Sequence, residues 1–429
     1  MIDEPGTAPG PAGGLAPRAA TGPLTTLANA GVGFAQSAAG FVARHWRGTI
    51  MVATFTPVAI YIVYLIVSGI IFWDFRVYQS GIAAYQAIGT PYDPQYLLEH
   101  YNNKFAFTSP PIIVLLLSQI SWLLTNPIWL GILLALHLAA WFFIPYLLLP
   151  RADRPPSKDA GWMYGAFLFA LGLLGTKMFV SGNATALVSW ASIGTLMFSI
   201  SKRNYLPFWI VLILACQVKF LFICLAIVPF LLDKKIWQPA LVAVIVAAIY
   251  ASNYVIAPDL ARGFSHAMQQ ISTDPMYIGQ AVMGAVQAIL RKGDMVPRSM
   301  FVPIALSVHA IYAVVLLAFA AALLWGKARP RDPHMAFLWA LSAAILASPR
   351  IIENDVAILV VPYIVFFRSV LEARGPGLVI AGAALIVGVS LSMTPIFMWG
   401  GLVAIIGMWF GIGFDWILGG RFPAPARAS

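Results

Sequence analysis

One aspartate has the setting of a general base. Asp74 follows a long apolar run and lies within the aromatic sequence FWDFR at 72–76. A carboxylate among aromatic side chains loses hydration, so its pKa rises unless a partner compensates for the loss. A raised pKa suits a group that takes a proton during a reaction. The alternative is a structural anchor, in which Asp74 pairs with Arg76.

Three cations lie close to the ends of apolar segments. They are Lys177, Lys219 and Arg350, and Lys219 is the clearest because it interrupts CQVKFLF at 216–222. An uncompensated ammonium group inside an apolar segment costs several kcal/mol or loses its proton. Binding of an anionic headgroup or a phosphate would account for these cations. The alternative for Lys219 is a structural partner such as Gln217 or a distant acid.

Other polar residues are candidates for binding a sugar. Tyrosines with neighbouring amides follow Asp74, namely Tyr78, Tyr85, Tyr92, Tyr96 and Tyr101 with Gln79, Asn102, Asn103 and Lys104. Aromatic faces with amide groups suit a sugar, although the same residues would also form an aromatic belt at a membrane interface. A second group, Glu353, Asn354 and Asp355, follows Arg350 and would either hold a sugar or cap a helix and pair with that arginine.

Small polar residues occur at a predicted helix start, in SGNAT at 181–185. They permit close approach of a ligand to the backbone, and Asn183 is the candidate contact. The sequence has no cluster of cysteine and histidine with metal-ligand spacing, no Walker loop and no GxSxG elbow. Neither a metal nor a cofactor is therefore expected.

The elements that must position these residues are membrane helices. Of the 429 residues, 60% are apolar and 10% are charged, and the mean hydropathy is +0.84. A soluble globular protein carries roughly 25% charged residues. The composition therefore excludes a soluble enzyme, a disordered chain and a fibrous protein, and it predicts an all-α polytopic membrane protein. The net charge of +10 marks cytoplasmic loops, and no nucleic-acid partner is expected.

The apolar segments predict about 10–13 spans, several of them shorter than the ~20 residues of a straight span. Short, interrupted segments are typical of broken or re-entrant helices that line a cavity. A single transmembrane domain is expected over 46–420, between a flexible cytoplasmic tail at 1–45 and a short cytoplasmic tail at 421–429. The segments lie at about 48–72, 110–125, 128–149, 161–178, 184–200, 206–218, 220–232, 237–256, 301–325, 335–348, 355–371, 377–394 and 397–417.

Basic residues orient these segments. The loops at 201–205, 233–235, 327–334 and 368–374 are rich in lysine and arginine and are expected in the cytoplasm. Two long polar stretches, 73–109 and 257–300, are then expected outside, and the second carries amphipathic segments that would lie over the membrane face. One conflict arises at the basic stretch 151–159, which simple counting places outside. It disappears if 110–125 does not cross, or if a short later segment does not span.

The order of several short motifs resembles glycosyltransferase family 87, the GT-C type mannosyltransferases that use polyprenyl-phosphate-mannose. A first span ends in Asp-Phe-x-Val-Tyr (74–78), and GTPYD (89–93) and FTSPP (107–111) follow. Gly182-Asn183, the lone Lys219 and Ser348-Pro349 come next. The resemblance runs over about 70–370. It implies a GT-C fold, an active site facing the periplasm or exterior, and Asp74 as the catalytic base.

The resemblance also implies a reaction. A hexosyltransferase of the bacterial inner membrane would move a sugar, with mannose as the family default, from a polyprenyl-phosphate donor to a glycolipid or glycan acceptor, with inversion. Phosphate-binding roles fall to Lys219, Lys177, Arg350 and Arg76. Sugar or acceptor contacts fall to Tyr78, Tyr92, Asn183, Glu353, Asn354 and Asp355. The main alternative is a transporter or flippase for a lipid-linked or small polar substrate, which would use similar broken helices.

Overall fold

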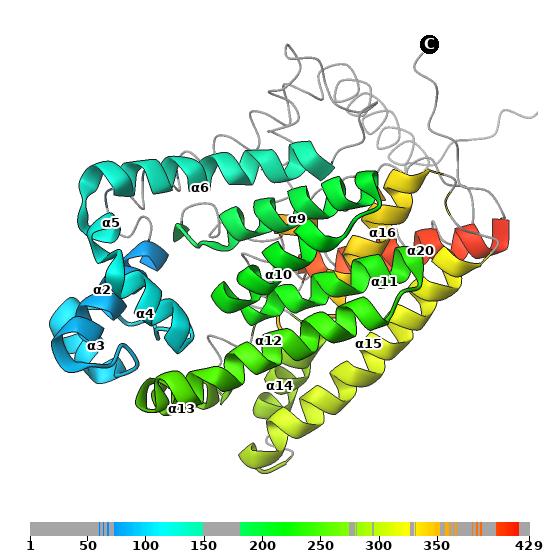
Figure 1. Ribbon diagram of the computed structural model, residues 1–429. Coiled ribbons are helices and arrows are strands. Elements are labelled where there is room, and N and C mark those ends of the chain that lie inside the picture. Colours follow the sequence, from blue (N-terminus) through cyan, green and yellow to red (C-terminus); the bar gives the residue numbers. More distant parts are fainter. Residues whose placement is uncertain are drawn as a thin grey trace, which may run out of the picture. The chain divides into compact units, whose positions relative to one another are not determined.

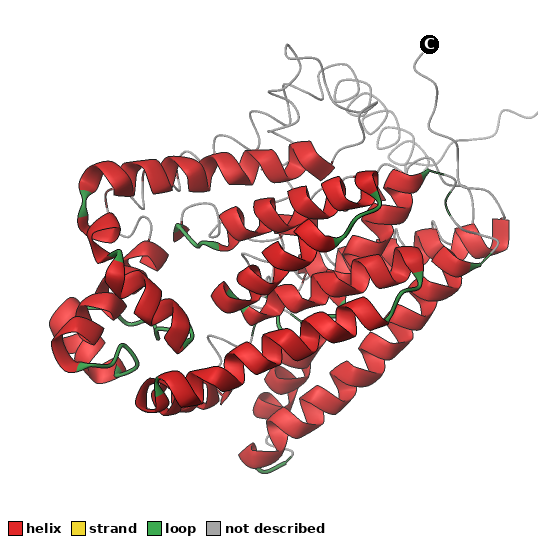
Figure 2. Cartoon of the chain, in the orientation of Figure 1, coloured by secondary structure: helices red, strands yellow, loops and turns green. Residues whose placement is uncertain are grey.

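The structure is a computed structural model that describes residues 73–148, 181–273, 281–293, 296–326, 332–351, 357–359 and 400–419, with a few isolated positions elsewhere. Every regular element in these ranges is a helix, and the same ranges hold no strand (Figure 2). The mostly helical fold predicted from the sequence is confirmed. The two predicted tails, most of the first predicted span and the basic stretches 151–159 and 368–374 lie outside the described residues.

The helices follow the predicted apolar segments and loops closely (Figure 1). The predicted outer loop and the segment after it form α2 (Trp73–Ile88), α3 (Pro94–Tyr101), α4 (Pro111–Gln119) and α5 (Ser121–Thr125). The other elements are α6 (Pro127–Leu148), α9 (Thr185–Lys202), α10 (Leu206–Val218), η3 (Phe220–Ala226), α11 (Ile227–Asp233), α12 (Trp237–Ile256), α13 (Pro258–Thr273), α14 (Val282–Gly293), η5 (Arg298–Met300), α15 (Phe301–Trp325), α16 (Pro333–Leu346), η6 (Ala357–Leu359) and α20 (Gly400–Gly419).

Two helical stretches in the described ranges are long and apolar enough to cross a membrane. They are Trp237–Ile256 and Arg298–Trp325, and only 17% and 22% of their most apolar windows are buried. The core helix of a soluble protein would be mostly buried, whereas these helices expose side chains such as Val244 and Ile311. Both stretches are therefore candidate membrane spans. The total of about 10–13 spans stays a prediction.

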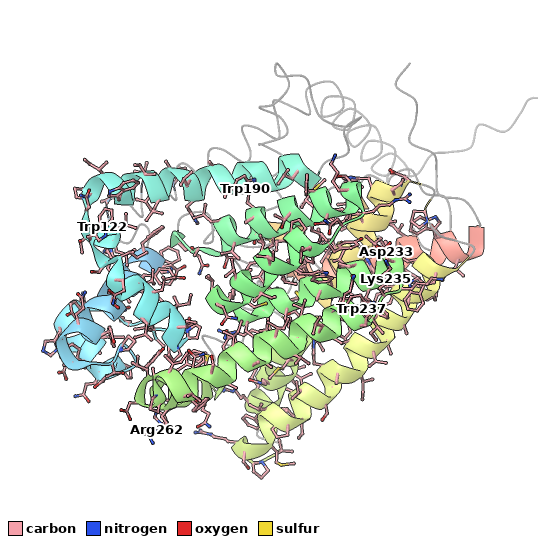
Figure 3. All side chains as sticks on the ribbon, in the orientation of Figure 1. Trp122, Trp190, Asp233, Lys235, Trp237 and Arg262 are labelled. Carbon is pink, nitrogen blue, oxygen red and sulfur yellow. The ribbon has the colours of Figure 1, made fainter. Side chains whose placement is uncertain are left out.

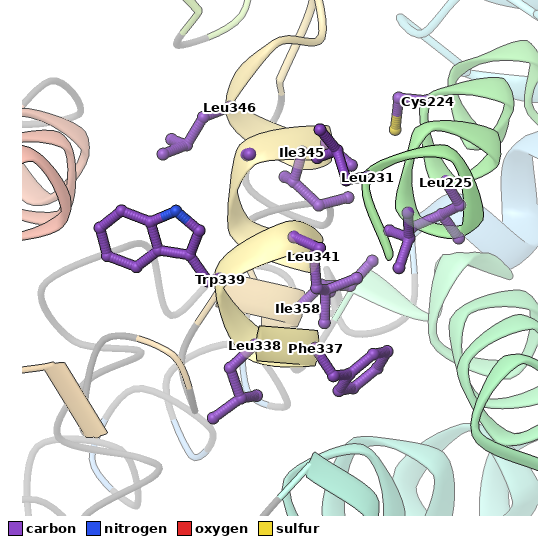
Figure 4. Close-up of a cluster of buried hydrophobic side chains, with 14 of the residues drawn as sticks. Cys224, Leu225, Leu231, Phe337, Leu338, Trp339, Leu341, Ile345, Leu346 and Ile358 are labelled. Carbon is purple, nitrogen blue, oxygen red and sulfur yellow. The ribbon is translucent and has the colours of Figure 1, made fainter. Parts of the chain in front are cut away.

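The largest apolar core surrounds α16. Its sequence is apolar on all sides, and every residue from Met335 to Leu346 is buried. Figure 4 shows Phe337 and Leu341 on the side of η3 and α11, while Trp339 points the other way. There the Trp339 ring stacks on Trp409 of α20, with 4.3 Å between ring centroids.

A second apolar cluster joins the two predicted outer loops. Val77 and Ile82 of α2, with Phe107, pack together with Leu260 and Ala267 of α13. Leu260 and Ala267 are seven residues apart, so they share one face of that amphipathic helix. The stretch 73–109 and helix α13 of the stretch 257–300, distant in sequence, therefore pack together, as expected if both stretches lie on one side of a membrane.

The structure describes segment 110–125, on which the predicted conflict around 151–159 depends. Segment 110–125 forms two short helices, α4 and α5, that stay against α2, and Gln79 Nε2 donates to the Leu124 carbonyl at 2.6 Å. Helix α6 then carries the chain away, and the carbonyl of its last residue, Leu148, lies 2.6 Å from His334 Nε2 at the start of α16. Helices α4 and α5 have 9 and 5 residues, each shorter than the ~20 residues of a straight span, which favours the first of the two predicted resolutions. The membrane topology itself stays a prediction.

One end of the bundle is basic. Lys202 and Arg203 end α9, and Lys234 and Lys235 follow α11, all four exposed. The two turns are adjacent, since the Tyr205 hydroxyl hydrogen-bonds the Asp233 carboxylate. Figure 3 shows Asp233, Lys235 and Trp237 at the start of α12, with Arg262 beyond the other end of that helix.

This arrangement predicts which residues can be labelled from each side. Arg262→Cys is expected to react with a membrane-impermeant maleimide added outside intact cells. Lys235→Cys is expected to react only after permeabilisation, because its basic loop is predicted to face the cytoplasm. The native cysteines, Cys216 and Cys224, are buried and give a low background. Labelling of both introduced cysteines from the outside would contradict this orientation.

Candidate functional site

The first turn of α2 meets the start of α9. Asp74 is the second residue of α2, and its Oδ2 accepts a hydrogen bond of 3.1 Å from Asn183 Nδ2, 109 residues further along the chain. The predicted base and one predicted sugar contact are therefore side by side. Arg76 is exposed and lies two positions along the helix from Asp74, which turns it to a different side of α2.

The loop before α9 fixes how Asn183 faces Asp74. Its Oδ1 accepts the backbone N–H of Thr185 at 2.9 Å and the Thr185 hydroxyl at 2.5 Å. Since the backbone N–H can only donate, these bonds assign Oδ1 to Thr185 and leave the NH₂ group for Asp74. The Asn183 backbone N–H in turn donates to Ser181 Oγ at 3.2 Å. Gly182, between them, has a φ of +72°.

Lys219 reaches the same loop from a broken helix. Helix α10 ends at Val218, Lys219 is extended with a φ of −151°, and the 3₁₀ helix η3 begins at the next residue. The break lets the side chain turn toward α9, where Lys219 Nζ donates to Thr185 Oγ1 at 3.4 Å. The hydrogen bonds then run in one direction from Lys219 through Thr185 and Asn183 to Asp74.

Burial controls the proton affinity of Asp74. The side chain is half-buried, and loss of hydration raises the pKa of Asp74 above its usual range. Hydrogen bonds from Asn183 and Ser181 and the charge of Lys219 lower that pKa in part. The result is a carboxylate that holds a proton more readily than an ordinary aspartate but is stabilised when ionised by three neighbours.

Tyr78 lies one turn along α2 from Asp74. Burial, and then the nearby charge of Asp74, raise the pKa of Tyr78, so this hydroxyl keeps its proton and can donate a hydrogen bond. The ring meets Phe107 edge to face, with 6.4 Å between centroids. Tyr78 is thus placed beside Asp74 by the same cluster that holds the outer loops together.

The structure describes two further predicted site residues, Tyr92 and Arg350. Tyr92 is buried among the loop helices, and its hydroxyl donates to the Ser109 carbonyl at 2.7 Å. Arg350 is half-buried beyond α16, and its carbonyl accepts a bond of 3.0 Å from Ser348 Oγ. Lys177, Glu353, Asn354 and Asp355 lie outside the described residues.

Ser181 and Thr185 also belong to the site. The sequence singled out their motif, SGNAT, but named only Asn183 as a candidate contact. The signal was present in part, because serine, asparagine and threonine at a helix start commonly bond nearby backbone groups. Nothing in the sequence indicates that these residues face Asp74 and Lys219. In the part of the chain that the structure describes, no group of three or more His, Cys, Asp or Glu is placed to hold a metal ion.

The left-handed backbone at Gly182 gives a test of this loop. Gly182→Ala is expected to cost about 1–2 kcal/mol of backbone energy and to displace Ser181 and Asn183 from Asp74. Gly89, whose φ is +76°, is a matched control, because a Cβ there would meet no atom within 4 Å. Both alanine variants should lower the unfolding temperature similarly in a thermal-shift assay. Only Gly182→Ala should also reduce the activity proposed below, and equal activities would contradict this role of the loop.

Comparison with known proteins assigns the chain to no family. No family model, curated protein or solved structure matches the chain. The resemblance seen in the sequence therefore stays a prediction, and the function proposed for the chain depends on the geometry around Asp74.

Proposed function

We propose that the chain is an integral membrane glycosyltransferase. It would transfer a sugar from a polyprenyl-phosphate donor to a glycolipid or glycan acceptor on the outer face of a bacterial inner membrane. One observation carries the proposal. A carboxylate with a raised pKa, Asp74, and a cation, Lys219, are the two ends of one chain of hydrogen bonds.

The carboxylate supplies the base that such a reaction needs. In the proposed step Asp74 takes the proton of an acceptor hydroxyl, and that oxygen forms a bond to the anomeric carbon of the sugar. The bond from this carbon to the phosphate oxygen breaks on the opposite face, so the configuration inverts. The raised pKa favours proton uptake, while Asn183 and Ser181 keep the carboxylate ready in its ionised form.

The cation supplies charge for the leaving group. Polyprenyl phosphate departs with the electron pair of the broken bond and gains negative charge. Lys219 is half-buried, and a fixed cation shielded from water stabilises such charge more strongly than one in bulk solvent. Because the phosphate already activates the sugar, the step requires no nucleotide. Mannose is the sugar that the resemblance implies.

A transporter or flippase is the second candidate, because the broken helix at Lys219 is also a feature of transporters. Transport needs two compartments, whereas transfer does not. Purified protein in detergent micelles, incubated with a labelled polyprenyl-phosphate sugar and candidate acceptors, separates the two. A labelled, inverted glycoside formed in micelles supports the transferase. Absence of product in micelles, with movement of the lipid across proteoliposomes, would support the transporter.

A further inference from the structure

In the proposed reaction Lys219 interacts with two anions, the Asp74 carboxylate and the phosphate of the donor or product. Its ammonium group is linked to the Asp74 carboxylate through Thr185 and Asn183, and its charge acts on that carboxylate. The same ammonium group would hold the phosphate of the donor and of the product. Asp74 is at one end of this network and the phosphate would bind at the other, at Lys219, so each anion would affect how strongly the other is held.

Linkage makes this effect reciprocal. If a phosphate at Lys219 raises the proton affinity of Asp74, then a proton on Asp74 must raise the affinity for phosphate by the same factor. Among the described residues, few other charged groups lie near Asp74. Tyr78, Ser181 and Asn183 face Asp74 as neutral groups, and His137 of α6 approaches the neighbouring Phe75 ring, with 6.4 Å between centroids.

We propose that the Asp74–Asn183–Thr185–Lys219 network expels the lipid-phosphate product when Asp74 loses the proton it took from the acceptor. This inference rests on the proposed function and adds a mechanism for product release. Directly after transfer, Asp74 is neutral and the phosphate carries its new charge beside Lys219, so the product is held most tightly. Loss of the proton from Asp74 to water restores the carboxylate. Its negative charge again attracts the Lys219 ammonium group and repels the phosphate.

Equilibrium binding of farnesyl phosphate, a short prenyl phosphate that carries no sugar, tests this without turnover. Its affinity for the purified protein is measured by isothermal titration calorimetry over about pH 5–9, a range that covers a raised carboxylate pKa. We expect wild-type affinity to fall, relative to Asp74→Asn, as Asp74 ionises. At the alkaline end Asp74→Asn should bind about 5- to 100-fold more tightly, the usual range of coupling between sites. Farnesyl phosphate itself loses a second proton near pH 6. This ionisation is the same in the titrations of wild type and Asp74→Asn, so it cancels in the ratio of their affinities.

Lys219→Met completes a double-mutant cycle. In the Lys219→Met background, Asp74→Asn should tighten binding much less, because the shared cation is gone. The wild-type protein and the single variant Asp74→Asn decide the outcome. If both bind farnesyl phosphate and the variant binds it no more tightly than wild type at any pH, the inference is overturned while the proposed function stands. If folded wild-type protein binds no farnesyl phosphate, the proposed lipid-phosphate donor is wrong and the inference is overturned with it.

Discussion

Asp74→Asn is expected to abolish sugar transfer while the protein still folds. The amide has nearly the shape of the carboxylate and can still accept the hydrogen bond from Asn183 Nδ2, but it cannot take a proton from an acceptor. General-base catalysis contributes about 100- to 10,000-fold to rate, so kcat should fall by that factor. Turnover of a labelled polyprenyl-phosphate sugar by the purified variant measures the effect.

Asp93→Asn is the matched control for this change. Asp93 lies in the same outer loop and caps α3, where its Oδ1 accepts the backbone N–H groups of Gln95 and Tyr96, both at 3.0 Å. Asparagine caps a helix about as well as aspartate, so this variant should keep wild-type turnover. Near-normal turnover by Asp74→Asn itself would remove Asp74 from the role of base.

Lys219→Met is expected to raise the KM for the lipid-phosphate donor and to lower kcat. Methionine keeps much of the length and apolar character of the lysine stem but removes the charge that would hold the leaving phosphate. A hydrogen bond to a charged group contributes about 1.5–3 kcal/mol, which corresponds to roughly 10- to 150-fold in kcat/KM for the donor. Steady-state kinetics with donor varied at saturating acceptor measure this loss.

Lys104→Met provides the comparison for Lys219. Lys104 is an exposed lysine of the outer loop and has no part in the network around Asp74, so its replacement should leave donor kinetics close to wild type. Lys219→Arg should recover part of the activity, because the charge remains while its geometry changes. Donor kinetics unaltered in Lys219→Met would show that Lys219 is a structural lysine.

The sequence predicted individual helices well where apolar runs end at strong breakers. The predicted segments 206–218 and 220–232 correspond to α10 and to η3 with α11, and 237–256 corresponds to α12. Lys219 separates the first two segments, Lys234 and Lys235 separate the second from the third, and Pro258 follows the third soon after its end, so local sequence decides where each helix can continue. Segment 110–125 was predicted less well. Its composition is that of a membrane span, but it packs against α2 as two short helices.

Residue type and local sequence are enough to identify the two charged candidates for the reaction. Asp74 and Lys219 are charges in apolar surroundings, and the cost of leaving such charges uncompensated marks them without any structure. Only the tertiary structure decided that they belong to one site. Asp74 and Asn183 are 109 residues apart, and their contact depends on how α2, α9 and the broken helix at Lys219 pack, which local sequence does not encode.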